Sequence, residues 1–262
     1  MNTIFSPHCS GGTPNQWRPL AERVRGEARL FAPPALIGYD PDEPWDPTRG
    51  PGLDDEARRI ENLLDVVPGP VDLVGHSYGG AVALRVALRR PERVRRLVVY
   101  EPALFSLLAI SPRDRAAAEE IVTVADAIRE ALEEGRSSRA AGLFVDYWSG
   151  KGVWDRLDER RRAYVESRMV KVVAEFDALA GDRTPLSAYA RLRMPVLWLE
   201  GGHSPAPVHA VRRQLLPVLP DARVERLPDA DHMGPVTRAA EVAEIVAAFL
   251  FEDAPEAMAL AA

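Results

Sequence analysis

The stretch V-D-L-V-G-H-S-Y-G-G, residues 71–80, constrains the fold of this chain more than any other. An apolar run leads directly into Gly75-His76-Ser77-Tyr78-Gly79, and a helical pattern follows at once. A turn this tight strains the serine backbone, and its glycines leave room for the neighbouring chain. The pattern predicts a strand, a sharp turn and a helix, with the Ser77 hydroxyl projecting above the sheet at the helix N-terminus. An incidental Gly-Ser turn is the alternative.

The rest of the chain alternates short apolar runs with amphipathic stretches. The strand-like runs cover residues 3–5, 28–31, 71–74, 94–100, 195–199 and 222–227. Apolar residues at helical spacing cover residues 14–24, 53–67, 80–89, 208–216 and 236–249. This alternation is typical of a parallel sheet whose strands are joined by helices, so we expect an α/β fold.

Between Ile110 and Tyr189 the pattern is helical throughout, without a convincing strand. We expect residues 110–190 to form a helical cap over a core made of residues 1–109 and 191–251. A plain structural subdomain is the alternative to a lid that shapes a cavity. Residues 252–262 are rich in alanine and are predicted to be a flexible tail.

The composition excludes several classes of function. The 33 basic residues are spread along the chain and are outnumbered by 39 acidic ones, so we expect no nucleic-acid partner. The single cysteine, Cys9, excludes an internal disulfide and a cysteine-based zinc site, and we predict neither a metal nor a cofactor. No signal peptide and no membrane-spanning run is evident. We therefore expect a cytoplasmic protein that acts on a small molecule without a membrane partner, as a monomer or a homodimer.

Several motifs resemble the α/β-hydrolase superfamily, in particular its serine-nucleophile members with a helical cap. They are the G-H-S-Y-G turn, R-R-L-V-V-Y-E-P after it, M-P-V-L-W-L-E-G-G beyond the cap, and D-A-D-H-M-G-P-V near the end. The family places its serine, acid and histidine in this order. The resemblance implies a mostly parallel α/β-hydrolase sheet. Because the first run resembles the family's third strand, we expect the two leading strands to be absent.

The resemblance also implies roles for single residues. Ser77 would be the nucleophile, and His232, in the loop after the last strand, would be its general base. The oxyanion hole would consist of the backbone N–H groups of Tyr78 and Ser10, with His8 supporting the second loop. Cys9 stands where the family usually has glycine, and we expect it to be an inert buried residue rather than a reactive thiol.

The acid is not where the family most often keeps it. In the frame G-x-x-D-P, the segment 201–205 has Ser204 at the aspartate position. Glu101 follows the strand after the nucleophile's strand, and parallel strands end at one edge of a sheet, so Glu101 is the first candidate. Glu200 is the alternative acid, and a site without an acid is the third reading.

We therefore expect a serine hydrolase that cleaves an ester or thioester through an acyl-serine intermediate. Phe105, Trp148 and Trp154 are predicted to bind a largely apolar substrate, although ordinary helix packing explains these aromatic residues equally well. Two other classes stay open, because a fold alone does not fix its chemistry. One is a lyase, cyclase or cofactor-free oxygenase, and the other is a ligand-binding protein with a vestigial triad.

Overall fold

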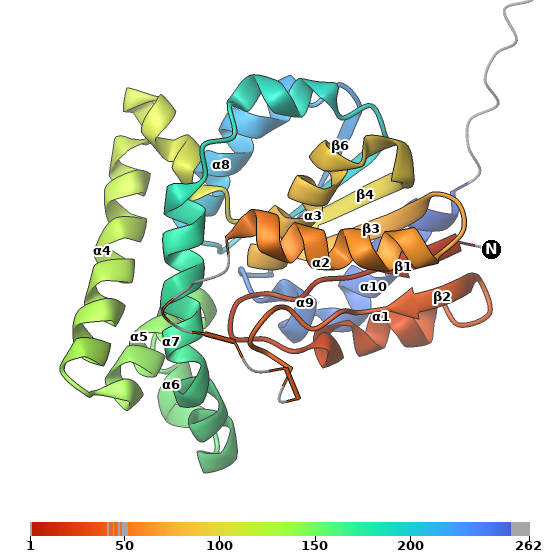
Figure 1. Ribbon diagram of the computed structural model, residues 1–262. Helices are drawn as coiled ribbons and strands as arrows, with labels where there is room; N and C mark the ends of the chain where they lie inside the picture. Colours follow the sequence, from red (N-terminus) through yellow and green to blue (C-terminus); the bar gives the residue numbers. More distant parts are fainter. Residues whose placement is uncertain (1, 41, 44, 47, 49–51, 253–262) are drawn as a thin grey trace, which may run out of the picture.

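A computed structural model of the protein describes residues 2–40, 42–43, 45–46, 48 and 52–252 (Figure 1). Its strands form one sheet in the order β2-β1-β3-β4-β5-β6, and every neighbouring pair is parallel. The strands are β1 (Asn2–Phe5), β2 (Ala28–Ala32), β3 (Val71–His76), β4 (Val94–Tyr100), β5 (Val196–Gly201) and β6 (Ala222–Leu227). Each arises from one of the six predicted runs, and the predicted α/β class is confirmed.

Helices cover both faces of this sheet. Leu73 and Val99 face one hydrophobic cluster, whereas Val74 and Val98 face the other, because successive side chains of a strand point to opposite sides. Strands buried on both faces are apolar at nearly every position, which explains the uninterrupted runs in the sequence. The first cluster includes side chains of α2 (Leu53–Val66), α3 (Tyr78–Arg89) and α8 (Ala206–Leu215), and the second includes those of α1 (Arg18–Arg23) and α10 (Ala239–Phe251).

Two predicted helices are interrupted. A 3-10 turn, Pro14–Trp17, precedes α1, and the short helix α9 (Gly234–Thr237) precedes α10. Helix α3 begins at Tyr78, two residues before the predicted start at Gly80, because the chain reverses within one residue at Ser77. Local spacing predicted that these helices exist, but not where each one starts.

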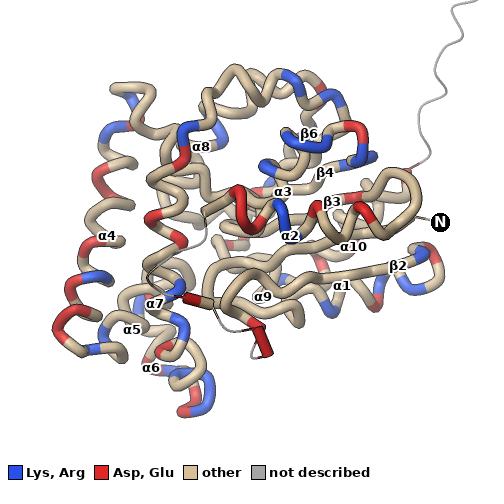
Figure 2. Tube along the Cα trace, viewed as in Figure 1, with Lys and Arg blue, Asp and Glu red and all other residues tan. Residues whose placement is uncertain are grey.

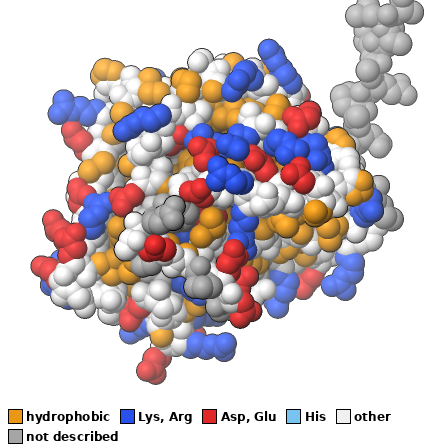
Figure 3. Space-filling model, in the orientation of Figure 1, with side chains coloured by type: hydrophobic (Ala, Val, Ile, Leu, Met, Phe, Trp, Pro, Cys, Tyr) orange, Lys and Arg blue, Asp and Glu red, His pale blue; other side chains and the backbone are white. Residues whose placement is uncertain are grey.

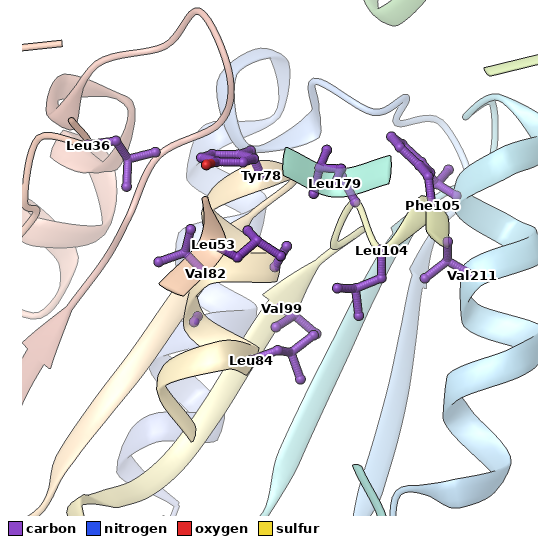
Figure 4. Close-up of a cluster of buried hydrophobic side chains, with 14 of the residues drawn as sticks. Leu36, Leu53, Tyr78, Val82, Leu84, Val99, Leu104, Phe105, Leu179 and Val211 are labelled. Carbon is purple, nitrogen blue, oxygen red and sulfur yellow. The ribbon is translucent and has the colours of Figure 1, made fainter. Parts of the chain in front are cut away.

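A helical layer lies beside the sheet, between β4 and β5 in the chain (Figure 1). Its helices fall within the residues expected to form a cap: α4 (Arg115–Glu133), α5 (Ser137–Ser149), α6 (Val153–Arg156) and α7 (Glu159–Gly181). Leu179 of α7 packs in the same hydrophobic cluster as Tyr78 and Phe105 (Figure 4). The cap and the core therefore share one hydrophobic core. Of the predicted tail, residues 253–262 lie outside the described residues.

Charged side chains of both signs are interspersed over the helices (Figure 2), and they lie next to one another on the face that Figure 3 shows. Many of them pair along or between helices, as Arg129 does with Asp126 and Asp177. In the described part of the chain, no helix is both long and apolar enough to cross a membrane.

Candidate active site

The turn between β3 and α3 places Ser77 in a strained conformation, with φ 54° and ψ −119°. A Cβ atom added to Gly75 would lie 2.5 Å from the carbonyl oxygen of Gly79, so the turn closes only with glycine there. A Cβ atom on Gly79 would lie 2.4 Å from the carbonyl oxygen of His8, in the loop after β1. The predicted strand, tight turn and helix are confirmed. The two glycines bring that loop directly against the turn.

His232 lies in the loop between β6 and α9, and its Nε2 is 2.9 Å from Oγ of Ser77. Two hydrogen bonds from side chains of the sheet hold this loop in place. The Nε2–H of His76 donates to the carbonyl oxygen of His232 at 2.8 Å, and the Tyr100 hydroxyl donates to that of Asp231 at 2.7 Å. Burial lowers the pKa of His76 well below its usual value, so this imidazole is neutral. His76 is thus part of the support for His232.

Glu101 holds the other side of this imidazole. Its Oε2 is 2.7 Å from Nδ1 of His232, and its Oε1 accepts the N–H of Gly201 at 2.7 Å. A carboxylate accepts hydrogen bonds and does not donate them, so Nδ1 carries the proton and Nε2 is free to accept one from Ser77. Ser77, His232 and Glu101 are therefore brought together as the sequence predicted, in one hydrogen-bonded chain that is almost wholly buried.

Glu200, the alternative acid, does not contact His232. Its carboxylate lies 2.8 Å from Nε of Arg212 and 3.3 Å from Nδ1 of His209, both on α8. Although burial opposes the effect, these two partners lower the pKa of Glu200 below its usual value. The alternative was wrong because the side chain of Glu200 turns toward α8. The Ser204 hydroxyl is buried and has no hydrogen-bond partner among the described residues.

The loop after β1 supplies the second region predicted to bind an oxyanion. The carbonyl oxygen of Cys9 accepts two hydrogen bonds, from Nδ1–H of His8 at 2.8 Å and from the N–H of Gly12 at 3.0 Å. The Cys9 C=O and the Ser10 N–H belong to the same trans peptide group, in which the two point in opposite directions. The Ser10 N–H therefore points away from the two donors that bind the Cys9 carbonyl. Ser10 lines the same cavity as Ser77 and His232. The N–H of Tyr78 opens α3, where helix N–H groups have no partner within the helix.

His8 and Cys9 are both buried, and burial shifts the pKa of each. It lowers the pKa of His8 to about 4, so the imidazole is neutral and donates through Nδ1 while Nε2 accepts the Leu36 N–H at 3.3 Å. It raises the pKa of the Cys9 thiol to about 12, which keeps the thiol protonated and unreactive. These shifts agree with a supporting His8 and an inert Cys9.

An apolar cavity lies above Ser77. Its volume is about 20 Å³, which is room for roughly one water molecule. The predicted residues Phe105 and Trp148 line it, and the centre of the Trp148 ring lies 4.2 Å from that of His232, with the two rings tilted by 35°. Sequence reasoning missed further walls that come from α5, α7 and the His232 loop: Phe144, Phe176, Leu179 and Met233. Helical spacing placed these residues on buried faces, but no local signal showed which faces meet Ser77.

Trp154, the third predicted binding residue, does not line the cavity. A Cβ atom on Gly142 would lie 3.1 Å from its ring, and the guanidinium of Arg162 lies 5.6 Å from the ring centre. The prediction for Trp154 was wrong because its indole packs between α5 and α7 instead.

Two larger spaces adjoin this cavity. A groove of about 620 Å³ shares Ser10, Phe144 and Trp148 with it and has mostly polar residues on its loop side, from Gly12 to Gln16. A second pocket of about 290 Å³ lies between α4 and α7 and shares Phe105 and Phe176 with the cavity. Aromatic side chains thus separate the cavity from both spaces. No cluster of three or more potential metal ligands occurs within the described residues.

The sequence of this chain matches a known family. A statistical description of the "Alpha/beta hydrolase family" matches residues 4–245. The chain belongs to the alpha/beta hydrolase family. Its resemblance to that superfamily in the sequence, and the predicted fold, are therefore confirmed.

Curated members of the family show the same relationship at low identity. The pimeloyl-[acyl-carrier protein] methyl ester esterase of Aromatoleum aromaticum is 26% identical over 86% of this chain and 88% of its own length. Lipase LipV of Mycobacterium tuberculosis is 33% identical over 44% of this chain. That match spans only 42% of the lipase, less than half of its length.

Solved structures of alpha/beta hydrolases agree in fold. MGS-M2, an alpha/beta hydrolase enzyme from a deep-sea metagenome library, superposes with a TM-score of 0.81 at 14% identity, covering 98% of this chain and 92% of that one. The enol-lactonase of Burkholderia xenovorans superposes with a TM-score of 0.71 at 20% identity, covering 96% and 92%.

Proposed function

We propose that this alpha/beta hydrolase is a serine hydrolase that cleaves an ester or thioester of a small, largely apolar substrate through an acyl-serine intermediate. The continuous chain from Ser77 Oγ to His232 Nε2, at 2.9 Å, and from Nδ1 to Glu101, at 2.7 Å, carries this proposal. A serine hydroxyl becomes a useful nucleophile only when a base takes its proton. Glu101 stabilises the imidazolium that then forms.

The proposed reaction has two stages, acylation of Ser77 and hydrolysis of the acyl-enzyme. Oγ of Ser77 attacks the acyl carbon as His232 takes its proton, and the Tyr78 and Ser10 N–H groups stabilise the oxyanion. His232 then protonates the leaving alcohol or thiol, which departs and leaves the acyl group on Ser77. A water molecule, deprotonated by His232, attacks this acyl-enzyme; the bond between the acyl carbon and Oγ breaks, His232 returns the proton to Oγ, and the carboxylic acid is released.

The walls of the site support the substrate class. Phe105, Trp148, Phe176 and Leu179 offer apolar contacts to the acyl group, and the polar loop beside the larger groove suits a leaving group. Two curated relatives carry the names of an esterase and a lipase. We also propose a cytoplasmic location, supported by a single cysteine that forms no internal disulfide.

Covalent labelling tests the mechanism. A fluorophosphonate should label the wild-type protein stoichiometrically at Ser77, and Ser77→Ala should abolish the label. Ser149→Ala, in the outer groove, is the matched control and should be labelled like the wild type. Absence of labelling in folded wild-type protein would contradict the proposal. Normal turnover by Ser77→Ala together with an inactive His232→Ala would instead indicate lyase or oxygenase chemistry without an acyl-enzyme.

A further inference from the structure

A second cluster of buried polar side chains lies between the cap and the core, and the acyl-transfer steps do not use it. It consists of Lys171 and Glu175 on α7, Glu56 on α2, and Tyr39 in the loop after β2. None of the four is more than 5% exposed. Burial of a charge is unfavourable unless the charge is paired and hydrogen-bonded. The hydrogen-bond partners of these four side chains therefore show which parts of the chain the cluster connects.

The contacts form a continuous path toward the oxyanion loop. Lys171 Nζ lies 3.0 Å from a carboxylate oxygen of Glu56 and 3.2 Å from one of Glu175. The Tyr39 hydroxyl donates to the other oxygen of Glu175 at 3.1 Å and accepts the N–H of Gly11 at 2.7 Å. The path therefore ends on the peptide that joins Ser10 to Gly11. Burial raises the pKa of Tyr39 well above its usual value, so the hydroxyl keeps the proton that it donates.

Helix α7 also holds the peptide that joins Gly12 to Thr13, two peptides further along this loop. The Tyr164 hydroxyl donates to the carbonyl oxygen of Gly12 at 3.0 Å. Gly11 has a φ of +67°, a region that glycine enters freely, so the loop needs restraints from outside to keep one conformation. On its other side, His8 fixes the Cys9 carbonyl from within the core. The proposed donor, the Ser10 N–H, thus lies between the restraint from His8 and two restraints on its other side: Tyr39, which Glu175 of α7 anchors, and Tyr164 of α7 itself.

We propose that Tyr39 and Tyr164 are positioning residues through which cap helix α7, with Glu175 as the anchor of Tyr39, sets the oxyanion loop. The inference rests on the proposed function, because an oxyanion forms only if Ser77 attacks a carbonyl. The packing of α7 against the core then also aligns the Ser10 N–H. Any displacement of α7 would therefore also misalign the second oxyanion donor.

Tyr39→Phe tests this coupling, because it removes the hydroxyl and keeps the ring that packs edge-on against His8. Loss of a whole oxyanion donor costs about 10² to 10³ in kcat, so misalignment of one should cost roughly 10- to 100-fold. We expect this loss in kcat for a p-nitrophenyl ester, with KM changed by less than about threefold, since the substrate's carbonyl is engaged fully only in the transition state.

Two further readouts separate positioning from a structural role. An alkyl boronic acid forms a tetrahedral adduct on serine, and its affinity should fall by the same factor as kcat. The affinity for the carboxylic acid product should stay within about threefold of the wild type. Tyr147→Phe is the matched control, because it removes another tyrosine–glutamate hydrogen bond in the cap, to Glu120 at 2.8 Å, and should leave kcat unchanged.

The outcomes separate this inference from the proposed function. Failure of a fluorophosphonate to label wild-type Ser77 overturns the proposed function itself. Labelled wild-type protein, together with a folded Tyr39→Phe whose kcat is within twofold of wild type, overturns only the positioning role. If Tyr39→Phe does not fold, Tyr164→Phe is the second test. We expect it to lower kcat while KM changes by less than about threefold. Unchanged kcat in that variant overturns the inference.

Discussion

The carboxylate of Glu101 lies 2.7 Å from the imidazole of His232 because β3 and β4 end in the same way. Tyr100 pairs with His76 at the last register position of these strands, and the next residue of each strand has a positive φ, 54° at Ser77 and 43° at Glu101. Non-glycine residues rarely adopt such angles, and functional sites are where they concentrate. Two neighbouring strands thus each turn one functional side chain over the same edge of the sheet.

Removal of the charge at Glu101 should slow the reaction strongly. In serine proteases, replacement of the triad aspartate by asparagine lowers kcat by about 10⁴, and we expect a loss of about 10³ to 10⁴ for Glu101→Gln. The matched control is Glu200→Gln, which removes a buried carboxylate that contacts α8 and not His232. Steady-state kinetics on an activated ester measure both. An equal loss in the two variants would contradict the assignment of the acid.

Substitution of Gly79 should displace the oxyanion loop. A Cβ atom there would lie 2.4 Å from the carbonyl oxygen of His8 and 2.5 Å from that of Pro7, and neither backbone atom can rotate away. We expect Gly79→Ala to lower kcat by about 10² or more, the cost of one lost oxyanion donor. Circular dichroism checks that the variant folds. Gly181→Ala, at the end of α7 with nothing within 4 Å, is the control and should be neutral or slightly stabilising.

The buried imidazole of His8 should make stability depend on pH. The pKa of His8 is about 4 in the folded protein and 6.5 in a solvated chain, so between these values the unfolded state binds more protons. The free energy of unfolding therefore falls as the pH is lowered through this window, by up to about 3 kcal/mol. His8→Asn should remove this contribution. Urea unfolding between pH 4 and 6.5 measures it, with the exposed His203→Asn as the control. Equal slopes for His8→Asn and wild type would contradict the prediction.

Widening of the wall at Phe105 should change the preferred acyl length. This side chain separates the small cavity above Ser77 from the pocket of about 290 Å³ between α4 and α7. We expect Phe105→Leu to raise kcat/KM for longer acyl esters relative to short ones, by about fourfold for each methylene newly buried. A series of p-nitrophenyl esters measures this. Trp154→Phe, outside the cavity, should leave the profile unchanged, and a shift there would count against the assignment of the walls.

Features that are determined by neighbouring residues, or by the order of the strands along the chain, were predictable from the sequence. The turn around Ser77 is set by its own glycines, and the position of Glu101 follows from the rule that parallel strands end at one edge. Features that depend on how helices face the sheet were not predictable. Phe144 and Trp154 both occur at helical spacing in the cap, yet only Phe144 reaches the cavity. Glu200 was a reasonable acid by position in the chain, but its side chain turns toward Arg212.

Ser77 and Glu101 both precede the cap, whereas His232 follows it. The chain can therefore be divided within the cap into two fragments, and the reaction then reports whether the fragments have associated. A cut at the exposed Gly135, in the turn between α4 and α5, leaves Ser10, Ser77 and Glu101 on one fragment and His232 on the other. Neither fragment alone contains both the Ser77 nucleophile and its base, His232. Esterase activity of the mixed halves would then measure their reunion, with the cap helices on both sides of the cut as the surface that rejoins them.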